Sequence, residues 1–469
     1  MKRKIRNIHF VGIGGVGMSG LAEFLQSQGY AVSGSDLAEN STTRRLARLG
    51  VEVSQGHDSR NVGLAHVVVV SSAIREDNPE IQEARNRKVP IIQRAEMLAE
   101  IMRLKDGIAV GGSHGKTTTT SLIGHVLDVA GLDPTSIIGG RVMGTGPDPS
   151  GTRVGQGSLL VAEADESDGS FLRLSPVMTV ITNIDPEHLD HYGDYAGLEN
   201  AFVDFANGIP FWGLAVLCID HPGVQAIVPR LSRRFITYGF SSQADLVASN
   251  LRAQAAGMRF TVHRHGTPLG EASLPMPGRH NVLNALASIA VALELEISFE
   301  LAAEALASFG GVERRYQSLG SAADVHLVDD YAHHPAELRA TLAAARSVHS
   351  GRIVSVFQPH RYTRTRDCMQ EFATAFNDSD VVIISEIYPA GDAPIPGVTG
   401  RALAEAISAH GHKGVRFIAD LDSIADQLPK QLNPGDLVLT LGAGDISTLG
   451  KRVLEKLSEN TSAAAEDDA

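Results

Sequence analysis

Residues 107–118 read Gly-Ile-Ala-Val-Gly-Gly-Ser-His-Gly-Lys-Thr-Thr, an apolar run that passes through glycines into Gly-Lys-Thr. This order predicts a buried strand, a tight loop and the first turn of a helix. In such a loop the backbone N–H groups surround phosphate oxygens, the lysine contacts the terminal phosphates and the threonine hydroxyl holds Mg²⁺. The loop is one residue shorter than usual, because Val110 stands where glycine is expected. A chance Gly-Lys-Thr at a helix start is the alternative, and it is disfavoured because strand, glycines and helix are in register.

Lys116 is the only lysine between Lys105 and Lys413, in a region with many arginines. A compact ammonium at this one position favours a role in a site. A general preference for arginine in the genome would leave the same pattern.

The composition is that of a globular protein with several domains. Of its 469 residues 43% are hydrophobic and 20% charged, and at about 100–200 residues per domain the length suggests three domains. No apolar run approaches the ~18 residues of a transmembrane helix, so no membrane insertion is expected, and the basic first residues lead into a strand rather than a signal peptide. Two distant cysteines, Cys218 and Cys368, fit the reducing cytoplasm. The net charge of −13 makes nucleic-acid binding improbable.

Short apolar runs alternate with helical stretches in three successive blocks, which predicts three α/β domains with largely parallel sheets. Segment 245–275 differs, because its alternation and turns suggest antiparallel hairpins before a helix at 282–293. We expect domain boundaries at 106/107 and 311/312, and a disordered tail of alanine, serine and acidic residues over 457–469. Strands are expected at residues 8–13, 31–33, 51–53, 67–71 and 90–92, at 107–110, 158–162, 177–181, 215–219 and 234–237, and at 325–328, 353–357, 381–385, 415–418 and 437–441.

A second glycine loop follows the first strand and reads Gly12-Ile13-Gly14-Gly15-Val16-Gly17. Glycines in this order let a backbone approach a diphosphate at a helix N-terminus, and Asp36, 24 residues after Gly12, is placed to hold a ribose hydroxyl. Ser71 and Ser72, after a later strand of the same sheet, add hydroxyl donors. The loop fits a dinucleotide or a nucleotide-sugar diphosphate equally well, and a tight turn used only for packing is the third reading.

Acidic side chains follow two later strands. The run at 159–162 ends in Glu-Ala-Asp-Glu-Ser-Asp from Glu163, and the run at 177–181 leads into Asn-Ile-Asp-Pro-Glu-His-Leu-Asp from Asn183. Carboxylates at strand ends beside a phosphate loop suit Mg²⁺, and one histidine among several acids is not the spacing of a zinc site. Two ordinary solvated loops are the alternative, which is weakened because both lie next to the phosphate loop in the chain order.

These three motifs, in this order and spacing, resemble the Mur ligase family of peptidoglycan synthesis, and the resemblance extends from Gly12 to about Gly444. It implies a Rossmann-like UDP-sugar-binding domain at 1–106, a central P-loop ATPase domain with a small antiparallel sheet at 107–311, and a Rossmann-like amino-acid-binding domain at 312–456. Ser113 replaces a family threonine, Ala332 stands where glycine is common, and no lysine is available to be carbamylated in the central block.

The resemblance also implies roles for individual residues. The expected UDP-sugar contacts are those of the first glycine loop (Gly12, Gly14, Gly15, Val16, Gly17, Asp36, Ser71 and Ser72). The expected ATP contacts are Gly112, Ser113, His114, Gly115, Lys116, Thr117, Thr118, Asn281, Asn284 and Arg315, and the expected ligands of two Mg²⁺ ions are Thr117, Glu163 and His188. On the amino-acid side it implies Tyr331, His333, Arg361 and Arg364, and the residues expected to be catalytic are Lys116, Glu163, His188, Arg315 and His333.

The activity implied by the resemblance is ATP-dependent ligation of L-alanine to the carboxylate of UDP-N-acetylmuramate through an acyl phosphate, by a cytoplasmic monomer or homodimer whose third domain closes over ATP. A dehydrogenase would explain the first glycine loop but not the acidic clusters, and a nucleotide switch or transport ATPase would explain only the second loop. Within the family, a recycling ligase that attaches a whole peptide to the same UDP-sugar is the nearest alternative.

Overall fold

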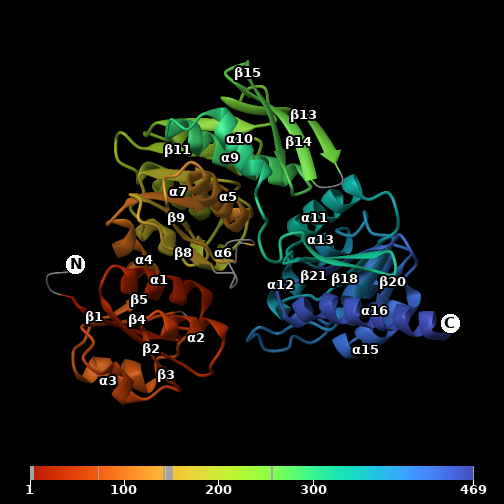
Figure 1. Cartoon of the computed structure of the whole chain (residues 1–469), viewed down its shortest axis with the longest axis horizontal. Coiled ribbons are helices and arrows are strands. Elements are labelled where there is room, and N and C mark those ends of the chain that lie inside the picture. Colours follow the sequence, from red (N-terminus) through yellow and green to blue (C-terminus); the bar gives the residue numbers. More distant parts are fainter. Residues whose placement is uncertain (1–4, 72, 141–142, 144–150, 255–256, 468–469) are drawn as a thin grey trace. The chain divides into compact units, whose positions relative to one another are not determined.

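A computed structural model describes the chain except residues 1–4, 72, 141–142, 144–150, 255–256 and 468–469. The chain forms two compact units. The first comprises Met1–Ser249, Thr261–Ala272 and Leu283–Gly310, and the second Asn250–Phe260, Ser273–Val282 and Gly311–Ala469. Three sheets carry the architecture, so the predicted α/β fold class with three sheet-forming segments is confirmed (Figure 1).

The N-terminal sheet is parallel, with strand order β3-β2-β1-β4-β5. The chain builds outward from β1 to β3 and then crosses to β4 on the other side of β1, so the strand order reverses at β1 and β4. Ligands of open α/β sheets bind at the carboxyl ends of strands at such a reversal. The elements are β1 (Asn7–Val11), α1 (Val16–Ser27), β2 (Ala31–Asp36), α2 (Ser41–Arg48), β3 (Glu52–Gln55), β4 (Val67–Val70), α3 (Pro79–Asn86), β5 (Ile91–Gln93) and α4 (Arg94–Met102).

The central sheet has ten strands in the order β15-β14-β13-β12-β11-β10-β6-β9-β7-β8. Strand β6 lies between β10 and β9 and is parallel to both, so the loops that follow these three strands meet at one edge. The elements are β6 (Asp106–Gly111), α5 (Lys116–Val129), β7 (Thr135–Ile137), β8 (Thr152–Arg153), β9 (Leu159–Glu163), β10 (Met178–Ile181), α6 (Leu189–Tyr192), α7 (Tyr195–Asn207), β11 (Leu214–Cys218), α8 (Pro222–Ile227), β12 (Phe235–Gly239), β13 (Leu246–Gln254), β14 (Gly257–Arg264), β15 (Thr267–Leu274), α9 (Arg279–Glu294) and α10 (Phe299–Ala307).

The N-terminal and central sheets share one buried core. Met97 and Met102 of α4 belong to the same apolar cluster as Phe10 of β1 and Leu160 of β9. A Cβ added at Gly20 of α1 would come within 1.9 Å of the Thr152 hydroxyl on β8. The glycine loop of the first sheet is therefore held at a defined place against the central sheet.

The C-terminal sheet has the order β16-β17-β21-β18-β19-β20, and it is parallel except for the pair β16–β17. Its buried strand β18 reads Ile-Val-Ser-Val-Phe, as expected for a strand covered on both faces. The elements are β16 (Gln317–Ala322), β17 (Val325–Asp330), α11 (Pro335–Val348), β18 (Ile353–Phe357), α12 (Tyr362–Asp367), α13 (Met369–Ala373), β19 (Val381–Ile384), α14 (Gly400–Ala409), β20 (Val415–Phe417), α15 (Leu421–Gln427), β21 (Leu437–Leu441) and α16 (Leu449–Asp467).

Every predicted strand is present, and the sequence reading missed the short strands β7 and β8 and the edge strand β16. The hairpin strands β13–β15 extend the central sheet through the pairing of β12 with β13, so they do not form a sheet of their own. Helix α16 extends from Leu449 to Asp467 and overlaps the segment 457–469 that was expected to be a tail. Val453 and Leu457 of this helix are buried.

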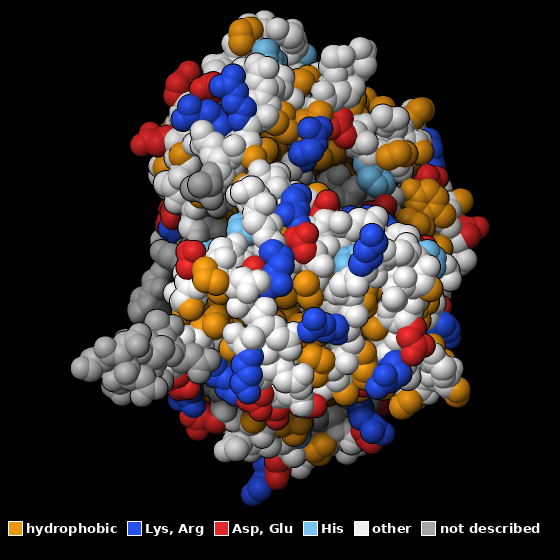
Figure 2. Space-filling view, turned by 90° about the vertical axis from the view of Figure 1, so that its right-hand side faces the viewer, with side chains coloured by type: hydrophobic (Ala, Val, Ile, Leu, Met, Phe, Trp, Pro, Cys, Tyr) orange, Lys and Arg blue, Asp and Glu red, His pale blue; other side chains and the backbone are white. Residues whose placement is uncertain are grey.

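The surface carries no sign of a bilayer span, since no helix in the described ranges is both long and apolar enough to cross a membrane. Figure 2 shows one face of the molecule, where lysine and arginine side chains are scattered among acidic and uncharged ones.

Candidate active site

The phosphate loop connects β6 to α5 and is fastened to the end of β10. The N–H of His114 donates to Asn183 Oδ1 at 2.8 Å, and the His114 carbonyl accepts from the Thr182 hydroxyl at 2.6 Å and from Asn183 Nδ2 at 3.0 Å. Gly112 and Gly115 have φ of +131° and +81°, values that favour glycine. A Cβ at Gly112 would lie 2.1 Å from the Thr182 hydroxyl, so this close approach excludes any larger residue.

Lys116 opens α5 and is held inside the loop. Its Nζ donates to the carbonyl of Gly112 at 2.6 Å, to the carbonyl of Ser113 at 3.2 Å, and to both carboxylate oxygens of Glu166 at 3.0 and 2.8 Å. Burial alone would lower the pKa of Lys116, but the charges of Glu166, Asp165 and Glu163 outweigh burial and raise the pKa. The lysine therefore stays protonated, and its anionic partner Glu166 was not among the predicted site residues.

The loop after β9 presents three acids toward this lysine. Glu163 Oε1 accepts the N–H of Gly139 at 2.8 Å, and Asp165 accepts the N–H of Ser167 at 3.1 Å. Burial would raise the pKa of Asp165, but Lys116 and the hydrogen bonds from Ser167 lower it. The carboxylates of Glu163 and Asp165, with the hydroxyl of Thr117 at the start of α5, are hard oxygen donors, and this donor chemistry fits Mg²⁺.

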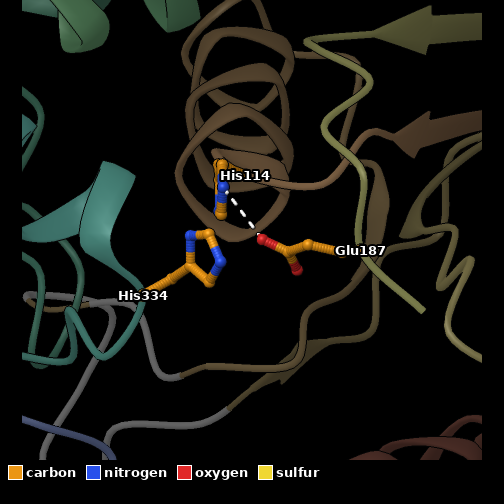
Figure 3. A group of neighbouring side chains, drawn as sticks. All are labelled: His114, Glu187 and His334. Atoms are coloured by element: carbon orange, nitrogen blue, oxygen red, sulfur yellow. Dashed lines mark ion pairs between the residues drawn. The ribbon is translucent and has the colours of Figure 1, made fainter. Parts of the chain in front are cut away.

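The loop after β10 binds the phosphate loop from the other side. Asp185 Oδ1 lies 3.2 Å from His221 Nε2, within hydrogen-bond distance, and its Oδ2 lies 3.3 Å from His114 Nε2; these two histidines hold the pKa of Asp185 far below its usual range. His114 Nε2 also lies 3.1 Å from Glu187 Oε1 (Figure 3). His114 is thus committed to positioning the loop.

His188 adopts φ of +55° at the N-terminus of α6, a conformation that is uncommon for a residue with a side chain. Its Nε2 lies 3.9 Å from Glu166 Oε1 and 3.8 Å from Glu187 Oε2. The predicted metal residue is therefore next to the lysine's carboxylate. Mg²⁺ prefers oxygen to imidazole nitrogen, so the two glutamates are the better-matched donors at this point.

A cavity of about 360 Å³ joins the two glycine loops. Its lining brings together predicted residues of both loops and one unpredicted arginine: Gly12, Gly15, Gly17, Met18, Ser71, Arg94, Leu98, Lys116, Ile137, Ile138, Gly139, Glu163 and Asp165. Across the ranges that the structure describes, the Arg94 guanidinium has no hydrogen bond or ion pair. A half-buried cation without a partner in a polar cavity is typical of an anion-binding site.

The first glycine loop is held by the end of β2. The N–H groups of Gly12 and Ile13 both donate to the Ser35 carbonyl, at 2.8 and 2.9 Å, and the N–H of Gly14 donates to Asp36 Oδ2 at 2.8 Å. Asp36, the predicted ribose contact, is therefore already engaged in shaping the loop. It also lines a second cavity of about 270 Å³ with α2 and β3, together with Ala38, Glu39, Thr43, Arg44, Ala47, Val53, Ser54 and Gln55. Ser72 lies outside the described residues, and of Val16 only the backbone, at the start of α1, is described.

The two asparagines of α9 have different surroundings. Asn284 is buried beside the phosphate loop: its Oδ1 accepts from the Thr119 hydroxyl at 3.1 Å and lies 2.8 Å from where a Cβ of Gly115 would be. Asn281, which belongs to the second unit, donates to the Pro277 carbonyl at 2.8 Å.

In the second unit, the predicted amino-acid residues gather after β17 and β18. The imidazole of His333 lies 3.0 Å from the Tyr331 carbonyl and 3.3 Å from Glu337, and the guanidinium of Arg315 lies 5.2 Å from the centre of the Tyr331 ring. Burial lowers the pKa of His333, and neighbouring arginines add to the effect. His334, the third side chain drawn in Figure 3, precedes α11, and its N–H donates to Glu337 at 3.2 Å.

His360 was missed by the sequence reading and completes this cluster. Its ring lies 5.8 Å from that of His333, and Arg364 Nη1 lies 3.3 Å from its Nδ1. Burial and these cations lower the pKa of His360 to about 4. Arg361 has φ of +70°, and its N–H donates to the Tyr388 carbonyl at 2.8 Å. Ala332 is not in the left-handed region, so alanine is accommodated where the family commonly has glycine.

The chain is similar to known proteins along most of its length. Three domain descriptions match in order: the Mur ligase family catalytic domain at residues 7–106, the Mur ligase middle domain at 110–292, and the Mur ligase glutamate ligase domain at 314–444. A UDP-N-acetylmuramate–L-alanine ligase of Sorangium cellulosum is 56% identical over 95% of both chains, and one of Myxococcus xanthus is 54% identical over 97% of this chain and 96% of its own.

Solved structures agree as well. The UDP-N-acetylmuramate–alanine ligase of Thermotoga maritima superposes with a TM-score of 0.81 at 32% identity, covering 97% of this chain and 99% of its own. A murein peptide ligase of Psychrobacter arcticus, at 23% identity and a TM-score of 0.70 over 97% of this chain and 99% of its own, shares the fold. The matched domains and the extent of identity show that the chain belongs to the Mur ligase family.

Proposed function

We propose that the protein joins L-alanine to the carboxylate of UDP-N-acetylmuramate with hydrolysis of ATP, which yields UDP-N-acetylmuramoyl-L-alanine, ADP and phosphate for peptidoglycan synthesis. The observation that carries this proposal is the similarity to eight relatives with that ligase name, which are 53–56% identical over 95–98% of the chain. The cavity that residues of both glycine loops line supports the proposal, because the reaction needs a sugar nucleotide beside ATP.

The first half-reaction activates the carboxylate. One of its oxygens attacks the γ-phosphorus of ATP, the bond to the β-phosphate oxygen breaks, and ADP leaves. The phosphate loop (Gly112 to Thr118) binds the phosphates, and Lys116 neutralises the charge that develops on their oxygens. Two Mg²⁺ ions held by Thr117, Glu163 and His188 would supply further neutralisation. Asn281 and Asn284 contact adenine, and Arg315 contacts the phosphates.

The second half-reaction forms the amide. The neutral amine of L-alanine attacks the acyl carbon, phosphate leaves, and the amine loses a proton. Arg361 and Arg364 bind the carboxylate of alanine, with Tyr331 beside them. His333 accepts the proton, because its lowered pKa keeps it neutral at pH 7.

The sugar nucleotide binds at the first glycine loop. The N-terminal N–H groups of α1 bind the diphosphate together with the first glycine loop (Gly12, Gly14, Gly15, Val16 and Gly17). Ser71 and Arg94, which line the same cavity, add donors, and Ser72, outside the described residues, is a further candidate. Asp36, whose Oδ2 accepts the Gly14 N–H, is the proposed acceptor for a ribose hydroxyl. We further propose that the protein is cytoplasmic and is a monomer or homodimer. We also propose that the C-terminal domain closes during turnover. Identical small-angle scattering profiles with and without ATP would contradict this closure.

The test is phosphate release with ATP, Mg²⁺ and UDP-N-acetylmuramate, in which only the amino component changes. L-alanine should support release and a tripeptide should not, whereas the reverse result would assign the chain to peptide recycling. Oxygen-18 placed in the sugar carboxylate should appear in the released phosphate. Absence of that label would exclude the acyl phosphate.

A further inference from the structure

Glu166 is the anionic partner of the catalytic lysine. Its carboxylate accepts from Lys116 Nζ with both oxygens, at 3.0 and 2.8 Å, and its side chain is 2% exposed. Because this ion pair is shielded from solvent, removal of one partner leaves the other charge buried and unpaired. The free-energy cost of such a removal is much larger than at a surface ion pair.

The backbone holds Glu166 in place. Its carbonyl accepts the N–H of Gly169 at 3.1 Å and also the hydroxyl of Tyr192, which comes from α6. His188, at the start of the same helix, lies 3.9 Å from Glu166 Oε1. The carboxylate is thus aimed at Lys116 by two chain segments.

Lys116 has no hydrogen-bond capacity left for a ligand in this arrangement. An ammonium has three N–H donors, and here they are directed to two loop carbonyls and to Glu166. A phosphate oxygen can receive a hydrogen bond from Nζ only if one of these acceptors is given up. Glu166 is the acceptor that carries the same sign of charge as the phosphate.

We infer that Glu166 is a positioning residue that orients Lys116 in the phosphate loop and competes with the terminal phosphates of the nucleotide for its ammonium group. This inference rests on the proposed role of Lys116 in ATP binding. The pair keeps the lysine ordered before binding, and Glu166 competes with the nucleotide for the same ammonium.

The experiment measures the dissociation constant of ADP by calorimetry in EDTA, so that no metal contributes. Glu166→Gln should bind ADP about 10–100-fold more tightly than wild type, the range expected for removing one charged hydrogen-bond competitor. The dissociation constant of Glu166→Asp should lie between those of wild type and Glu166→Gln, because the shorter side chain keeps its charge but its oxygens lie farther from Lys116 Nζ. Glu76→Gln, the same change at an exposed ion pair with Arg85, should leave the constant unchanged.

A double-mutant cycle separates this inference from the proposed function. The increase in ADP affinity caused by Glu166→Gln should disappear in a Lys116→Ala background, because Glu166 then no longer competes with ADP for an ammonium group. If Lys116→Ala alone leaves ADP affinity intact, the proposed role of the lysine fails. If Lys116→Ala weakens binding but neither Glu166 variant tightens it, the role of Glu166 is refuted while the proposed function stands. Thermal unfolding of each variant establishes that it is folded.

Discussion

Replacement of Gly115 by alanine tests the reasoning about the phosphate loop. Gly115 has φ of +81°, and a Cβ there would lie 2.8 Å from Asn284 Oδ1. Asn284 is buried and accepts from the Thr119 hydroxyl, so the methyl group forces this side chain to move and breaks that hydrogen bond. Left-handed backbone costs alanine about 1 kcal/mol, and a lost buried hydrogen bond adds about 1–2 kcal/mol.

Gly131 provides a matched control, because its φ is +77° and nothing lies within 4 Å of its would-be Cβ. Gly131→Ala should therefore show only the backbone strain of about 1 kcal/mol, against about 2–3 kcal/mol for Gly115→Ala. Urea unfolding followed by the fluorescence of Trp212, the only tryptophan and a member of the same unit, measures the difference. Equal losses for the two variants would refute the claim that Asn284 restricts the loop.

Three further predictions follow from the charges in the structure. Glu80 is fully buried, and its carboxylate lies 3.1 Å from His9 Nε2. Burial raises the pKa of Glu80, but hydrogen bonds from His9, Asn61 and Ser35 outweigh burial and lower the pKa overall. The ionised carboxylate therefore stabilises the fold above the unfolded pKa of about 4.3, and this stabilisation disappears as the pH falls through the folded pKa. Glu80→Gln should thus destabilise the protein by about 2 kcal/mol at pH 7 in urea titrations, and progressively less as the pH falls below about 4.3. Because the pKa of His333 is lowered, the acid limb of the pH–rate profile that this histidine causes should lie below pH 6.5, whereas a rise above pH 7 reflects deprotonation of the alanine amine; an acid limb that persists unchanged in His333→Gln would argue against His333 as the base. Removal of Mg²⁺ by EDTA should abolish phosphate release, and Glu163→Gln should raise the Mg²⁺ concentration needed to restore it, whereas an unchanged requirement would remove Glu163 from the metal site.

Local sequence patterns determined the strands and the fold class. Buried parallel strands are short apolar runs, and glycine loops mark where they turn into helices, so β1, β6, β9 and β10 were all predicted together with the motifs that follow them. The hairpins at 245–275 were also found, but their attachment to the central sheet depends on the pairing of β12 with β13. The tail at 457–469 was expected from composition alone, which does not reveal that Val453 and Leu457 of α16 are buried.

The sequence by itself determined which residues can do chemistry, since Gly-Lys-Thr, the acidic run at Glu163 and the arginines after β18 are local signals. Only the tertiary structure decided which of them meet. Lys116 and Glu166 are 50 residues apart, and they form an ion pair because β6 and β9 are neighbours in the sheet. Arg94 faces Lys116 across one cavity because the first two sheets share a core. Such contacts are determined by strand order and packing. These depend on the whole chain, so the local sequence around either residue does not predict the contact.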